Sequence, residues 1–246
     1  MKFERIKKYL GEEWLDEQVK EIEGLKWVKD KKGMRTTELI QTGYFILKKI
    51  EEFIEKFESL NGFDVWVSET KNSKTNFKDH FFELMSLEIF LDKADFFNLM
   101  EKNESYMPEA FVKKGDKEFF LECTNLDGIP NSIENKVSKL FTKSRNKFGE
   151  SEGIHLLGTF DFFNADTQKP THDFNFLKYH IERRFHRKKG HSTIGFFLTN
   201  FFITFHPKLK KNFLAREYWL ILNPNLPKWN SEEFKDLIKV DGFKIL

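Results

Sequence analysis

Four glutamates in the middle of the chain are the residues whose positions best suit chemistry. Glu83 and Glu88 lie in Phe81–Leu91, a segment so apolar on all sides that it predicts a buried helix. Glu109 opens one predicted strand and Glu122 lies in the next. Burying a carboxylate costs several kcal/mol unless it is paired or bound to metal. For the two helix acids, a nearby Lys or Arg or a solvent-facing strip is the alternative explanation.

The two strand acids are expected to meet through a hairpin. Strands are predicted over 109–113 and 118–125, with a turn at Gly115 between them. Because side chains alternate along a strand, Glu122 and Thr124 should point to the same side of the sheet. The hairpin would bring the first residue of the first strand close to Glu122. Two strand acids and one helix acid would then offer hard oxygen ligands, which suit Mg²⁺ or Mn²⁺ and not Zn²⁺.

This order of helix, strand, hairpin, strand and helix resembles the PD-(D/E)xK restriction-endonuclease-like nuclease superfamily over roughly residues 77–160. Pro108-Glu109 takes the place of the family's Pro-Asp, and Glu122-Cys123-Thr124 that of (Asp/Glu)-x-Lys. Glu83 stands where the family often carries a helix acid, and Glu88 is the alternative. The resemblance implies an α/β fold with a restriction-endonuclease-like core, in which helices flank a central mixed β-sheet.

The activity that this resemblance implies is metal-assisted hydrolysis of phosphodiester bonds in DNA. The acids would hold Mg²⁺ or Mn²⁺, as in a restriction or mobile-element defence endonuclease. The family lysine would position the attacking water, but Thr124 stands in its place and carries no charge. A lysine of the following helix is one explanation: Lys136, Lys139 or Lys143. The other is lost catalysis, leaving a nucleic-acid-binding or protein-interaction domain on a degenerate nuclease-like fold.

Two basic clusters are candidates for contact with DNA phosphates. The first occupies one predicted helix and holds no acid: Lys136, Lys139, Lys143, Arg145 and Lys147. The second lies where another predicted helix ends: Arg183, Arg184, Arg187, Lys188 and Lys189. An ordinary solvated helix face accounts for the first cluster equally well. The helix macrodipole, which favours cations near a C-terminus, accounts for part of the second.

Alternating helical and strand patterns indicate one α/β unit, with residues 1–62 as a helical N-terminal extension of a core over 63–246. The third expected helix, over 77–91, could extend to Met100, and 69–76 is expected to be a loop. The expected helices cover 3–29, 37–60, 77–91, 131–148, 174–187 and 232–238, and the further expected strands cover 63–67, 154–160, 193–205 and 217–222.

Composition sets the broad class of this 246-residue chain. With a net charge of +2 it lacks the strongly basic balance of a histone-like protein, so DNA would have to bind a local basic patch. The single cysteine, Cys123, excludes an internal disulfide and a cysteine-based zinc site. No apolar run approaches the ~20 residues that cross a bilayer. We therefore expect a cytoplasmic protein without a membrane partner, and a homodimer stays open because double-strand cutters often act as dimers.

Overall fold

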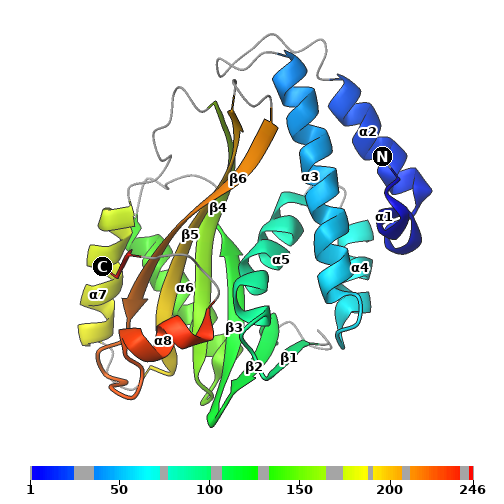
Figure 1. Ribbon diagram of the computed structural model, residues 1–246. Helices are drawn as coiled ribbons and strands as arrows, with labels where there is room; N and C mark the ends of the chain where they lie inside the picture. The colour runs from blue at the N-terminus through cyan, green and yellow to red at the C-terminus, as the bar shows by residue number, and fades with distance from the viewer. Residues whose placement is uncertain are drawn as a thin grey trace.

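In the part of the chain that the structure describes, seven strands form one mixed sheet whose spatial order follows the chain (Figure 1). The computed structural model describes residues 2–24, 36–72, 77–100, 107–126, 133–164, 174–187, 191–206, 211–238 and 244–245. The strands are β1 (Phe96–Leu99), β2 (Ala110–Lys114), β3 (Lys117–Asn125), β4 (Gly153–Asn164), β5 (Thr193–His206), β6 (Lys211–Leu222) and β7 (Lys244–Ile245). β1, β2 and β3 form an antiparallel meander, β3, β4 and β5 are parallel, β6 is antiparallel to β5, and β7 is parallel to β6.

Helices α6 (Ile133–Phe148) and α7 (Phe174–Arg187) cover one face of this sheet, behind it in Figure 1. Each connects two parallel strands, which need such a crossover. Their apolar sides pack with β4 and β5 in a cluster that includes Phe141, Phe185 and Phe196. This cluster fixes where the polar side of α6 meets the sheet.

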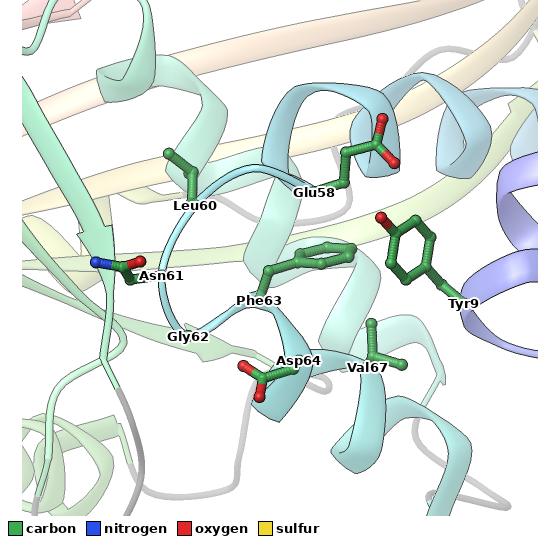
Figure 2. A pocket seen from close by; sticks show the side chains of 8 residues that line it. All are labelled: Tyr9, Glu58, Leu60, Asn61, Gly62, Phe63, Asp64 and Val67. Carbon is green, nitrogen blue, oxygen red and sulfur yellow. The ribbon is translucent and has the colours of Figure 1, made fainter.

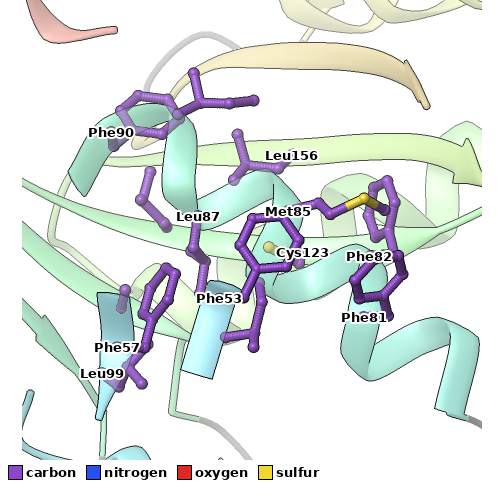
Figure 3. Packing of buried hydrophobic residues seen from close by; sticks show 14 of the residues in the cluster. Phe53, Phe57, Phe81, Phe82, Met85, Leu87, Phe90, Leu99, Cys123 and Leu156 are labelled. Atoms are coloured by element: carbon purple, nitrogen blue, oxygen red, sulfur yellow. The ribbon is translucent and has the colours of Figure 1, made fainter. Parts of the chain in front are cut away.

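The opposite face carries the remaining helices: α1 (Glu4–Tyr9), α2 (Glu12–Gly24), α3 (Thr36–Phe57), α4 (Phe63–Asn72), α5 (Phe77–Leu91) and α8 (Ser231–Leu237). α5 lies against the sheet, and Phe53 and Phe57 of α3 pack on it from outside (Figure 3). Cys123 of β3 points into this cluster beside Met85. The N-terminal helices therefore share one continuous hydrophobic core with α5.

Most predicted elements are confirmed, but three expectations between residues 63 and 100 were wrong. The segment 63–67 belongs to helix α4 and not to a strand, because Phe63, Trp66, Val67 and Thr70 are buried at helical spacing. Residues 69–72 complete that helix, whereas 73–76 lie outside the described residues. The third helix ends at Leu91 and does not reach Met100, since β1 lies between them.

Two glycines mark sharp changes of direction among the N-terminal helices. The predicted helix over 3–29 is divided into α1 and α2 at Gly11, whose φ is +101°. Gly62 joins α3 to α4 with φ +79°, and a Cβ there would lie 2.4 Å from the backbone oxygen of Leu99. Only glycine fits such a position without strain.

Candidate active site

The pairing of β2 with β3 places Glu109 opposite Glu122. Ala110 is the partner of Leu121, and the Glu109 backbone N–H donates to the Leu121 carbonyl at 2.9 Å. The next pair along this register is therefore Glu109 with Glu122. Side chains directly opposite each other on antiparallel strands point to the same face. Because Cys123 faces α5, this face is the one that α6 covers.

Two lysines of α6 reach the Glu122 carboxylate, which has no exposed surface. Lys143 Nζ lies 2.6 Å from Glu122 Oε1, and Lys147 Nζ lies 3.7 Å from Oε2. Lys143 also donates to the Thr124 hydroxyl at 2.8 Å and to the Cys123 carbonyl at 3.0 Å. Lys147 donates to the Met107 carbonyl, next to Pro108. One end of α6 is thereby tied to β3 and to the segment that leads into β2.

The electrostatics of Glu122 reflect burial more than pairing. Burial, and then the charge of Glu109, raise the pKa of Glu122 to about 7, although Lys143 and Lys147 act in the opposite direction. The carboxylate therefore changes protonation near neutral pH. Its binding of a proton or a cation depends on pH in that range.

His155 of β4 completes the cluster, and it was not among the site residues predicted from the sequence. Its Nε2 lies 2.8 Å from the Thr124 hydroxyl, and its Nδ1 lies 2.6 Å from the Ser144 hydroxyl of α6. Its ring stacks on Phe196, with centroids 5.5 Å apart. Burial, together with the charges of Lys143 and Lys147, holds the pKa of His155 well below its usual value. A histidine inside the apolar run 154–157 was the available sequence signal.

The two helix acids lie on α5, across the sheet from Lys143. Glu88 is ion-paired with Lys56 of α3. Glu83 lies 3.8 Å from His80, and after burial its charge contributes to raising the pKa of Cys123, as do the charges of Glu109 and Glu122. Of the two helix acids, Glu83 is therefore the one whose charge acts on a residue of β3.

The predicted basic residues divide into two groups. Lys143 and Lys147 turn inward to Glu122, whereas Lys139 and Arg145 of α6 and Arg183 and Arg187 of α7 are exposed. Arg184 donates to Ser138 at 3.1 Å and so links α7 to α6. Lys136 is partly buried, and Lys188 and Lys189 lie outside the described residues.

The donor set fits Mg²⁺ or Mn²⁺ with two carboxylates. Among the described residues, no group of three or more His, Cys, Asp or Glu side chains is arranged to hold a metal ion. Mg²⁺ is commonly bound by one or two carboxylates and completes its shell with waters and substrate phosphates. Glu109 and Glu122, opposite each other on one face of the sheet, supply two such carboxylates.

Comparisons with family models, curated proteins and solved structures find no match. None of the helices in the described ranges combines the length and the apolar character that crossing a membrane requires.

A pocket also lies at the far corner of the N-terminal helices (Figure 2), lined by Tyr9, Glu58 and Phe63 among others. Glu58 follows α3 and is one of two acids in this lining, with Asp64. It is ion-paired with Arg5 at 3.3 Å and with Lys8 at 3.7 Å. The charge of that acid is thus already compensated within the protein.

Proposed function

We propose that this chain is a metal-dependent nuclease that hydrolyses phosphodiester bonds in DNA, built on a variant PD-(D/E)xK site. The observation that carries the proposal is the apposition of Glu109 and Glu122 on one face, with Lys143 at Glu122 and Thr124. The order α5, β1, β2, β3, α6, β4 supports the same proposal. A role in restriction or in defence against mobile elements is the setting that we propose for it.

Lys143 is the residue that we propose in place of the family lysine. Its ammonium contacts the hydroxyl of Thr124, the position that the lysine would occupy, at 2.8 Å. It also lies 2.6 Å from Glu122, whose side chain shares a face of β3 with that of Thr124. Lys136 and Lys139 lie one to two turns further along α6 from this contact. The lysine-free motif is therefore compatible with catalysis.

Acids and lysines of this chain would have separate roles in the proposed hydrolysis. Glu109 and Glu122 would hold the metal ion, whereas the predicted ligands Glu83 and Glu88 lie on α5, at the opposite face of the sheet. When bound, the ion would polarise the scissile phosphate and lower the pKa of the attacking water. Lys143 would stabilise negative charge that develops on the phosphate. Lys139 and Arg145, which are exposed on the same helix, would contact neighbouring backbone phosphates.

The test is cleavage of supercoiled plasmid DNA in Mg²⁺ or Mn²⁺, repeated with EDTA. We expect cleavage that EDTA abolishes, and its loss in Glu122→Gln and Lys143→Met. Glu118→Gln is the matched control, because Glu118 is on the same strand but its side chain is 54% exposed. DNA binding without cleavage in any metal would contradict the nuclease and support a non-catalytic binding domain. Linear product at the first cut would point to paired sites, and hence to a homodimer.

A further inference from the structure

The polar side chains between β3, β4 and α6 form one connected chain. It runs from Ser144 through His155 and Thr124 to Lys143, which ends at Glu122. Ser144 and His155 have no exposed surface. Buried polar groups of this kind are costly unless each donor meets an acceptor. The direction of every bond in this chain can therefore be worked out from what each group is able to donate.

The direction follows from the two ends. At one end, the Ser144 hydroxyl donates to the Leu140 carbonyl at 3.0 Å, so that its oxygen is left to accept from His155 Nδ1. At the other end, the Lys143 ammonium has donors only, so the Thr124 oxygen must accept from it. The Thr124 proton then has His155 Nε2, 2.8 Å away, as its acceptor. This arrangement satisfies each group, and it requires neutral His155 with its proton on Nδ1.

We infer that His155 is a positioning residue: its Nε2 accepts the Thr124 proton and thereby turns a lone pair of that hydroxyl toward the Lys143 ammonium. Thr124 thus replaces the missing lysine by holding one that arrives from another element. The contribution of these hydrogen bonds to cleavage rests on the proposed nuclease function, whereas their effect on the position of Lys143 does not. Because β3, β4 and α6 meet at this point, the Lys143 side chain has less freedom to move than an unsupported lysine on the surface.

The first measurement needs no activity. In the folded protein, the rate at which the N-hydroxysuccinimide ester of acetic acid acetylates Lys143, releasing N-hydroxysuccinimide, is followed by peptide mass spectrometry, with exposed Lys139 as the internal reference. We expect the Lys143 rate to rise severalfold in Thr124→Val and in His155→Phe and to stay low in Thr124→Ser. Phenylalanine keeps the stacking on Phe196 but accepts no hydrogen bond. Nitrogen NMR of the His155 ring in the wild type should show the proton on Nδ1.

The second measurement separates positioning from mere structure. With DNA cleavage as the readout, Thr124→Val and His155→Phe should each lower kcat by roughly 100-fold, the scale of a misplaced catalytic group, with KM little changed. The double variant should be no slower than either single variant, because both changes break one path. Thr124→Ser, which keeps the hydroxyl, should restore most of kcat.

Each outcome decides the inference. Unchanged Lys143 labelling in His155→Phe, or an Nε2-protonated ring, overturns it whether or not the protein cuts DNA. Labelling that rises in Thr124→Val alone also overturns it, since Thr124 would then hold the lysine without His155. If His155→Phe does not fold, the ring spectrum and the Thr124 pair decide. Raised labelling in both Thr124→Val and His155→Phe, together with a wild type that cleaves no DNA, upholds the positioning and removes the nuclease.

Discussion

Replacing Glu122 with glutamine should stabilise the protein while it abolishes metal-dependent function. Glutamine has nearly the shape of a protonated glutamate and never ionises. Burial raises the pKa of Glu122 from 4.5 to about 7, even with Lys143 and Lys147 beside it. Ionising this group at neutral pH therefore costs folding free energy that glutamine does not incur.

The size of this stability cost and the pH range in which it appears follow from the pKa values of Glu122 in the unfolded and native states. The native state holds the Glu122 proton up to pH about 7, whereas the unfolded chain releases it near 4.5. The wild type accordingly has its full stability below pH about 4.5 and loses stability as the pH rises toward 7. At about 1.4 kcal/mol for each pH unit, the loss is about 3 kcal/mol. For a domain of this size it corresponds to roughly 6–12 °C in Tm.

The assay is urea unfolding of wild type and Glu122→Gln between pH 4.5 and 8.5 in EDTA. The two proteins should be equally stable at the acid end, and the variant should be more stable by about 3 kcal/mol above pH 7. The matched control is Glu118→Gln on the same strand, which is exposed and should change stability little at either pH. Adding Mg²⁺ or Mn²⁺ should stabilise the wild type and not the variant.

A less stable Glu122→Gln at pH 8 would refute this reasoning. It would mean that the two lysines more than offset the burial of the carboxylate, so that Glu122 serves the fold as an ion-pair anchor. The same result would remove the main physical argument for a cation site, because the acid would then need no further partner.

Three further changes test the fold and the DNA surface. Gly62→Ala should lower the free energy of unfolding by about 3 kcal/mol in urea, whereas Gly115→Ala, with open space around it, should cost about 1 kcal/mol. Asn230→Ala removes the cap that accepts two backbone N–H groups of α8, and should lower Tm by roughly 2–4 °C, for about 1 kcal/mol. Lys139→Ala should reduce the salt dependence of DNA binding by about one unit of slope in anisotropy titrations, and Lys235→Ala on α8 should not.

The hairpin that carries Glu109 and Glu122 could be predicted because its information is local. A glycine turn and strict alternation fix which residues of two adjacent strands face each other, and these gave the apposition of Glu109 and Glu122. The short helix α4 was missed because the five residues 63–67, rich in aromatic and β-branched side chains, fit a strand as well as a helix. Its true period becomes visible only when the pattern is followed as far as Thr70.

The choice of Lys143 among the α6 lysines could not be predicted, because it depends on how the helix sits on the sheet. All four lysines share a helix face, and their spacing alone does not distinguish them. The packing of Phe141 against Phe185 and Phe196 fixes the position and rotation of α6. With that packing in place, Lys143 and Lys147 reach Glu122, while Lys139 stays exposed.

The location of the buried polar groups is itself an argument for function. Glu122, His155 and Ser144 have no exposed surface, and they gather where β3 and β4 meet α6. A buried ion pair seldom adds stability over well-packed apolar side chains, so a protein under selection for stability alone has no need of one here. The α5 side of the same strands shows what such packing looks like, with Leu121 and Cys123 against phenylalanines. One face of β3 is therefore apolar, and the other holds the carboxylates, the lysines and the histidine. The buried polar groups argue that function is located on this second face.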